Sequence, residues 1–225
     1  MPISPDLDKG MSLLIISRVP QKPKTPVIFP VGTAEKDEWL RHMRGIAVPQ
    51  RLSGFPRDAR GYVITYSAYF DLKGIPQFLT PDERRRLFCA ENRLCQMCGQ
   101  PLDSEIVSIA GEDVLTSAVK KFEEPFMHEE CAHYAAQVCP FLAHARFTEY
   151  VKKLPTRQGT TVSRADEPRE RPEKMIFYVT DDYEYKVVEE RSPKTGQLLL
   201  CRAEIFANTQ IRSAPLPPRF EPSKT

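Results

Sequence analysis

The feature that most constrains the fold of this chain is the stretch CQMCGQPL, residues 95–102. It separates Cys95 from Cys98 by two residues and places Gly99 directly after them. Such a pair can be half of a metal site, a redox pair or two buried thiols. A redox pair stands where a helix begins, and Gly99 and Pro101 disfavour a helix start here. A knuckle turn aims both thiolates at one point and uses glycine where φ is positive, so the sequence predicts half of a zinc site.

A structural zinc ion takes four protein ligands, so two more donors are needed. Cys131 and Cys139 would give an all-cysteine set, but they lie eight residues apart on one predicted helix, about 12 Å along its axis. Two ligands of one zinc ion must lie within about 4 Å of each other. His128 and Cys131 meet this condition, because they are three residues apart on one helix face. The predicted ligands of one structural Zn²⁺ are therefore Cys95, Cys98, His128 and Cys131.

This order of ligands predicts a treble clef, which combines a knuckle, a β-hairpin and a helix whose first turn carries the last two ligands. Residues 105–119 supply the hairpin, with its turn at Gly111, and residues 127–142 supply the helix. The 29 residues between Cys98 and His128 suit a hairpin of this size. The predicted fold class is α+β, a treble-clef-like zinc module flanked by β strands, with Pro-rich termini.

The other thiols and imidazoles are not expected to bind the metal. His133 lies about 200° around the helix from Cys131 and is expected to be exposed. The remaining thiols are expected to be packed, namely Cys89, Cys139 and Cys201. Two further histidines are expected at the surface, His42 and His144.

Proline marks both ends of the chain. It accounts for 21 of 225 residues, nearly twice the average usage. The predicted organisation is an extended arm over 1–33 with a short strand near 12–17, an α+β domain over 34–153 that contains the treble clef, a linker over 154–174, a β-hairpin region over 175–212 that packs on the main domain, and a disordered tail over 213–225.

Apolar periodicity and turn residues predict the other elements of the domain. Residues 34–46 are expected to form a helix with one apolar face, made by Trp39, Leu40, Met43 and Ile46. Residues 60–70 are expected to form a strand, and residues 71–78 to turn into a second short strand. Residues 79–92 are expected to form a helix with Thr80 as its cap, Pro81 at the first helical position and Glu83 completing a capping box.

Charge and hydropathy bear on the partners of the chain. The formal net charge is +2, and residues 81–155 carry nine basic and twelve acidic side chains, so 9 − 12 = −3. Nucleic-acid-binding modules are normally basic, so nucleic acid is not favoured, and the run from Arg84 to Arg86 is interpreted as a solvated helix face. No apolar run is long enough to cross a membrane, and no signal peptide is recognised. We therefore expect a cytoplasmic protein with no membrane partner and with reduced thiols.

The sequence resembles a family of uncharacterised bacterial and phage proteins. The resemblance rests on RDARGYVITYSAYFDLKGIPQF, LCQMCGQPL and EPFMHEECAHYAAQVCPFL, and it covers about residues 57–142, with a weaker echo over 175–205. The chain departs from the family over 110–122, where members carry a Gly-Pro-rich run and an Asn, and this sequence has AGEDVLTSAVKKF instead. The resemblance supports the same four ligands and implies no activity.

Four ligands leave zinc no open position, so the predicted site folds the domain and does no chemistry. The expected function is a non-enzymatic binding or adaptor protein of phage or bacterial origin, acting on a host or phage protein or on a nucleic-acid-associated protein. One alternative is an HNH-like nuclease, active or degenerate, which would need a second metal centre built from His133 with Asp103 or Asp113. The other is a zinc-dependent DNA-binding regulator, which a basic helix face would favour.

Overall fold

The structure is a computed structural model and describes residues 34–71, 74–147, 174–191, 198–207 and 211–223. Its described helices are α2 (Ala34–Arg44), α3 (Glu83–Asn92), α4 (Asp113–Thr116), α5 (Glu129–Val138) and α6 (Pro140–Ala143), with a 3-10 turn η1 (Gln50–Leu52). Its strands are β1 (Ala68–Phe70), β2 (Pro76–Pro81), β3 (Ile106–Gly111), β4 (Lys121–Phe122), β5 (Met175–Thr180), β6 (Tyr183–Arg191), β7 (Leu198–Ala207) and β8 (Arg212–Pro215). The fold class is therefore α+β, as predicted. None of these helices has the length and hydropathy to cross a membrane.

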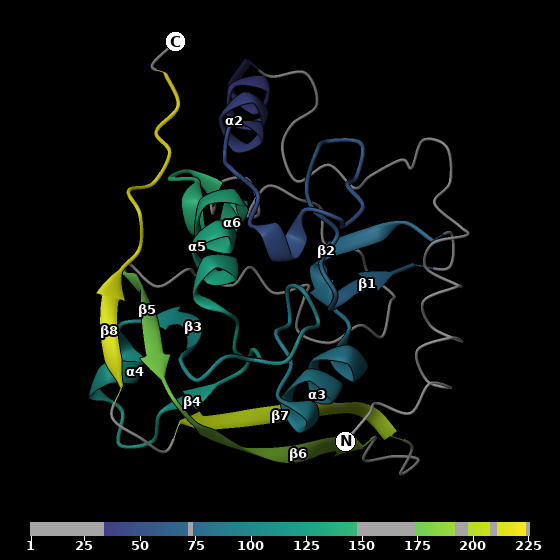
Figure 1. The fold of residues 1–225 in the computed structure, drawn as a ribbon, viewed down its shortest axis with the longest axis vertical. Helices are drawn as coiled ribbons and strands as arrows, with labels where there is room; N and C mark the ends of the chain where they lie inside the picture. The colour runs from purple at the N-terminus through teal and green to yellow at the C-terminus, as the bar shows by residue number, and fades with distance from the viewer. Residues whose placement is uncertain (1–33, 72–73, 148–173, 192–197, 208–210, 224–225) are drawn as a thin grey trace.

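Strands of the described chain form antiparallel sheets that join distant parts of the sequence. The first has the order β3–β5–β8, with Ile106 opposite Thr180 and Gly111 opposite Met175. The second has the order β4–β7–β6, in which β6 and β7 form a hairpin. β1 and β2 make a separate pair. In Figure 1, α2, α5 and α6 lie above these two three-stranded sheets, and α3 lies against the β6–β7 hairpin.

The predicted hairpin over 105–119 is wrong. Residues after Gly111 form the short helix α4, and β3 pairs with β5, more than sixty residues further along the chain. Lys120 stabilises this turn, because its ammonium group donates to the carbonyls of Val114, Leu115 and Ser117 at the end of α4. What remains of a hairpin is one bridge, in which Val107 and Met127 exchange two backbone hydrogen bonds of 2.8 Å.

The predicted strand over 60–70 is shorter in the structure, where only Ala68–Phe70 is a strand. The side chain of Asp58 accepts hydrogen bonds from the backbone N–H groups of Arg60 and Tyr62, at 2.9 and 3.0 Å. A carboxylate that captures backbone donors in this way competes with strand pairing. The second strand also shifts, to Pro76–Pro81, so the helix after it is capped by Asp82 instead of Thr80 and starts at Glu83.

Two predicted helices are present with changed ends. The helix predicted over 34–46 is α2, and its residues Trp39, Leu40 and Met43 are buried as expected. The helix predicted over 127–142 starts at Glu129 and is divided into α5 and α6 at Cys139. Pro140 begins α6, because proline fits the first position of a helix but not its interior.

The C-terminal predictions are partly wrong. Within 175–212, β6 and β7 form a hairpin, but β5 and β8 belong to the other three-stranded sheet. The tail predicted to be disordered over 213–225 is ordered through residue 223, because β8 pairs with β5 and Phe220 packs on aromatic rings. The predicted arm over 1–33 and most of the predicted linker over 154–174 lie outside the described residues.

Buried side chains of the described residues form two core clusters. One cluster packs α2, α5 and the 95–98 knuckle around Trp39, Met43 and Phe177. The other lies between α3 and the two three-stranded sheets and includes Phe126, Tyr178 and Ile205. Cys95, Cys98 and Cys131 belong to the first cluster, so the candidate site lies inside the core.

Candidate metal centre

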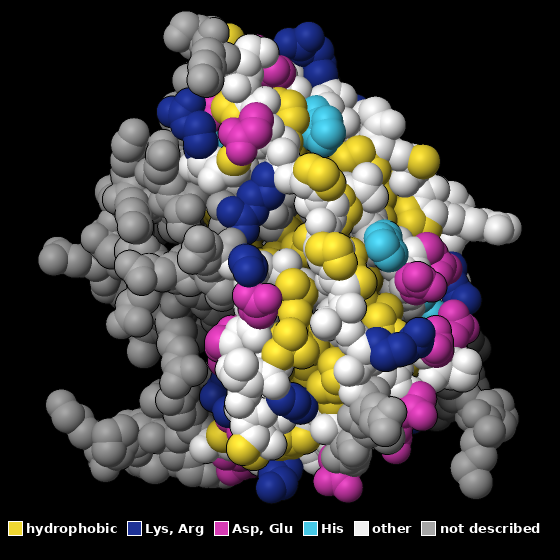
Figure 2. Space-filling model, turned by 90° about the vertical axis from the view of Figure 1, so that its left-hand side faces the viewer, with side chains coloured by type: hydrophobic (Ala, Val, Ile, Leu, Met, Phe, Trp, Pro, Cys, Tyr) yellow, Lys and Arg dark blue, Asp and Glu magenta, His cyan; other side chains and the backbone are white. Residues whose placement is uncertain are grey.

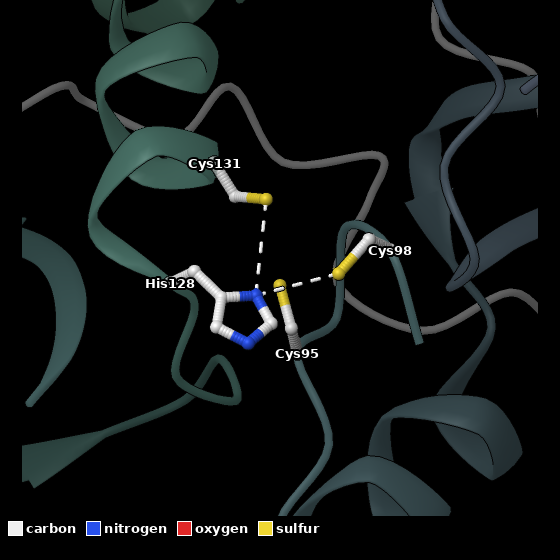
Figure 3. Close-up of side chains that lie close together, drawn as sticks. All are labelled: Cys95, Cys98, His128 and Cys131. Carbon is white, nitrogen blue, oxygen red and sulfur yellow. Dashed lines mark hydrogen bonds between the residues drawn. The ribbon is translucent and has the colours of Figure 1, made fainter. Parts of the chain in front are cut away.

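All four predicted ligand residues come together at one point in the structure (Figure 3). Their potential ligand atoms all lie within 4.8 Å of one another, and all four residues are buried. Nδ1 of His128 lies 3.4 Å from Sγ of Cys98 and 4.0 Å from Sγ of Cys131. Donors around a tetrahedral zinc ion are about 3.3–3.8 Å apart, as bond lengths of about 2.0–2.3 Å require. The three thiols and the imidazole therefore lie close enough together to hold one metal ion.

The knuckle that carries Cys95 and Cys98 is a closed turn fixed by backbone hydrogen bonds. Gly99 donates to the carbonyl of Cys95 at 2.7 Å, and Cys95 donates to the carbonyl of Gln100 at 2.9 Å. Gly99 has φ +68°, which an L-residue adopts only with strain. Its Cα also lies so close to Tyr66 that a methyl group there would be 2.5 Å from the ring. The glycine is thus required twice, for its backbone angle and for its lack of a side chain.

The start of α5 positions the other two donors. The bridge between Val107 and Met127 fixes the chain just before the helix, and His128 is the N-cap residue. His128 therefore precedes α5 by one position, whereas the sequence pattern predicted it inside the helix. Cys131 follows in the first turn, where the helix dipole favours a thiolate. The one-turn spacing that selected this pair is preserved, because Ala132 already donates to the carbonyl of His128 at 2.9 Å.

The second ring nitrogen of His128 shows which nitrogen is available to a metal. Nε2 lies 2.8 Å from the carbonyl oxygen of Pro101, where it donates its proton. This leaves Nδ1 as the unprotonated nitrogen, and Nδ1 is the atom that faces the thiols (Figure 3). A hydrogen bond from the distal nitrogen to a carbonyl is the usual way in which a ligating histidine is oriented.

Sequence reasoning missed Arg51, which joins the surroundings of the site. Its guanidinium bonds to Glu130 at 2.6 Å, to Asp103 at 2.9 Å and to Gln100 at 3.2 Å, and it lies 3.3 Å from Nε2 of His128. It therefore connects η1, the exit of the knuckle and the first turn of α5. No sequence signal identifies it, because a single arginine has no periodicity or spacing that relates it to cysteines more than forty residues away.

The three thiols strongly affect one another's ionisation. Hydrogen bonds from Cys131 and Cys98 stabilise the thiolate of Cys95 and lower its pKa far below the ordinary value. The same hydrogen bond to Cys95 raises the pKa of Cys131. A hydrogen bond from Cys131 lowers the pKa of Cys98, but its contact with Cys95 and burial outweigh this and raise the pKa to about 11. Crowded thiols resist joint ionisation unless a cation neutralises them.

The pKa of His128 is subject to opposing effects. Burial lowers it, but hydrogen bonds with Cys95 and with the carbonyl of Pro101 raise it, and the net shift is upward. A divalent ion would oppose this shift, because a ligating imidazole must be neutral.

Other residues singled out in the sequence lie outside this cluster. His133 is exposed as predicted, with its ring 4.4 Å from that of Phe177. Cys89 is buried and Cys139 is partly buried at the end of α5, while the side chain of Cys201 is outside the described set. His42 is exposed, but the prediction of a surface position for His144 is wrong, because it is fully buried against Trp39.

The run from Arg84 to Arg86 is also not the solvated face that the sequence predicted. Arg84 is exposed, but Arg86 is buried and forms ion pairs with Glu83 and Glu124. Arg85 donates to the carbonyl of Tyr66 at 2.7 Å. Two of the three arginines therefore hold α3 against neighbouring segments.

Comparison of the chain with protein-family models, with curated proteins and with solved structures gave no significant match. The chain has an α+β fold with a buried Cys₃His cluster that could hold a metal ion.

Proposed function

We propose that the protein binds one structural Zn²⁺ through Cys95, Cys98, His128 and Cys131. The observation that carries this proposal is the convergence of four buried soft donors within 4.8 Å. Thiolate and imidazole sets of this kind select zinc over harder divalent ions. When bound, Zn²⁺ would cross-link the knuckle to the start of α5 and neutralise the thiolates. Three thiolates and one Zn²⁺ sum to −3 + 2 = −1, and Arg51 lies next to this charge.

On this basis we infer a non-enzymatic binding or adaptor function, with a protein partner of host or phage origin or one associated with nucleic acid. A site with four protein ligands has no open coordination position for a substrate. Side chains that a nuclease would need are engaged elsewhere, since Asp103 pairs with Arg51 and His133 lies on Phe177. These contacts support a structural role for the metal ion over a catalytic one.

The binding function and its nuclease alternative can be separated in one set of experiments. Purified wild-type chain is incubated with duplex and single-stranded DNA in the presence of Mg²⁺, Mn²⁺ or Ni²⁺, and in parallel is immobilised to capture proteins from a host lysate. We expect no cleavage and a stoichiometric partner whose capture is lost in Cys95→Ser/Cys98→Ser. Metal-dependent cleavage that disappears in His133→Ala, while the variant keeps the zinc content and unfolding transition of the wild type, would overturn the proposal, since a lost contact with Phe177 could then not explain the effect.

A further inference from the structure

The C-terminal segment Leu216–Ser223 contacts α2 and residues 143–145 through Phe220 and Ser223. In Figure 1 it leaves β8 and runs past α5 and α6 toward α2. Figure 2, which views this side of the molecule, shows hydrophobic side chains gathered in a band. We call the surface under this segment the tail groove and define it by Glu38, Trp39, His42, Ala143 and His144.

The tail groove holds one aromatic side chain. The ring centroid of Phe220 lies 4.8 Å from that of His42, 5.5 Å from that of Trp39 and 5.6 Å from that of His144. Aromatic pairs at such distances contribute beyond the area that they bury. Phe220 itself stays partly exposed. It is therefore an anchor at the surface and not a member of the closed core.

The groove also binds the backbone on both sides of this anchor. Phe220 donates to the carbonyl of Ala143 at 2.7 Å and accepts from the N–H of Ala145 at 3.2 Å. Three residues later, the backbone N–H and hydroxyl of Ser223 both donate to the carboxylate of Glu38, the hydroxyl at 2.8 Å. Three aromatic rings around Phe220, two backbone hydrogen bonds and the side-chain carboxylate of Glu38 together resemble a peptide-recognition site.

The sequence of the bound segment fits this kind of recognition. LPPRFEPS, residues 216–223, contains three prolines, which cannot donate backbone hydrogen bonds and which preform an extended chain. Pro-rich ligands dock in aromatic-lined grooves because little conformational entropy is lost on binding. The groove and its occupant thus reproduce, within one chain, the chemistry of a Pro-rich peptide on its receptor.

We propose that the tail groove is the docking site for a partner segment of the same chemistry, a Pro-rich stretch with a phenylalanine followed by a hydroxyl residue. The chain's own Leu216–Ser223 occupies the groove in cis and competes with that partner. This inference rests on the proposed binding function and names the chemistry that the function would recognise. Trp39 is the only tryptophan of the chain and lies in the groove, so its fluorescence reports on occupancy.

The test titrates a synthetic peptide of residues 214–225 into a chain truncated after Pro215 and follows the fluorescence of Trp39. We expect a saturable change, and about tenfold or more weaker binding of the matched peptide with Phe220→Ala. The intact chain should bind the peptide at least about tenfold more weakly than the truncated chain, because the cis segment is present at an effective concentration near the millimolar range.

A folded truncated chain that gives no response to the peptide would overturn the inference, as would equal binding of the Phe220→Ala peptide. If the truncated chain does not fold, full-length Phe220→Ala replaces it, and it must then bind the wild-type peptide more tightly than the wild-type chain does. Zinc content is measured on the same samples. If the chain retains zinc but does not bind the peptide, the docking inference is contradicted and the zinc proposal is not. If the chain folds without zinc, the zinc proposal is contradicted.

Discussion

Gly99→Ala should be among the most damaging small substitutions in this chain. The added methyl group would lie 2.5, 2.7 and 2.9 Å from three ring atoms of Tyr66. Tyr66 cannot easily withdraw, because its N–H donates to the carbonyl of Met97 at 2.9 Å and its carbonyl accepts from Arg85 at 2.7 Å. The left-handed backbone at Gly99 adds about 1–2 kcal/mol for an L-residue, and overpacking adds about 1–3 kcal/mol. We therefore expect a loss of about 2–5 kcal/mol in the free energy of unfolding.

The assay is urea denaturation at a fixed free zinc concentration, because an ion bound only by the folded state adds to apparent stability. Gly54→Ala is the matched control, since nothing lies within 4 Å of the position that its added methyl group would take and its φ is not positive. The control should change stability by less than about 1 kcal/mol. Tyr66→Ala combined with Gly99→Ala should recover the steric part, about 1–3 kcal/mol. Gly99→Ala within about 0.5 kcal/mol of Gly54→Ala would refute this account of the knuckle.

Three further predictions concern side chains around the site and the tail groove. Arg51→Met should weaken zinc retention in a chelator competition by about 10–100-fold. The control Arg84→Met, at an exposed position, should leave zinc retention unchanged. Equal zinc retention by the two variants would show that the Arg51 contacts do not support the site. Tyr62→Phe should lower the free energy of unfolding by about 1–3 kcal/mol, because the buried indole N–H of Trp39 loses its acceptor at 2.6 Å, while the exposed Tyr185→Phe should be neutral. The pKa of Glu38 is lowered chiefly by the hydrogen bond from the Ser223 hydroxyl, and the charges of Arg41 and His144 lower it further. The stabilisation of the docked tail by this carboxylate should therefore be complete above the ordinary carboxyl pKa. It should be lost as the pH falls through the lowered pKa of Glu38. Trp39 fluorescence should report this acid transition, and the transition should be absent in Glu38→Gln. An unchanged transition in Glu38→Gln would show that another group causes it.

The candidate ligands could be predicted from the sequence because their constraint is local. A C-x-x-C-G knuckle and a one-turn His–Cys pair each restrict a few consecutive residues, and the same spacing excluded Cys139. Helix α2 could be predicted for a similar reason, since its buried residues Trp39, Leu40 and Met43 recur with the period of a helix.

The features that were missed depend on contacts between distant residues. The pattern of β3 predicts a strand but not its partner, and β5 lies beyond a long intervening segment. Arg51 becomes part of the site only after η1 is placed beside the first turn of α5. The tail was predicted to be disordered because its proline content is high, yet a single anchor, Phe220, and the pairing of β8 hold it in place. Composition alone does not reveal such anchors.

The central claim is tested most directly by the zinc content of the purified chain and of single cysteine variants. We predict one equivalent of zinc in the wild type and in Cys139→Ser, whose thiol lies outside the cluster, and less than half an equivalent in Cys131→Ser and in Cys95→Ser/Cys98→Ser. Less than about half an equivalent in the wild type, or no loss of metal in the Cys95→Ser/Cys98→Ser variant, would contradict the account.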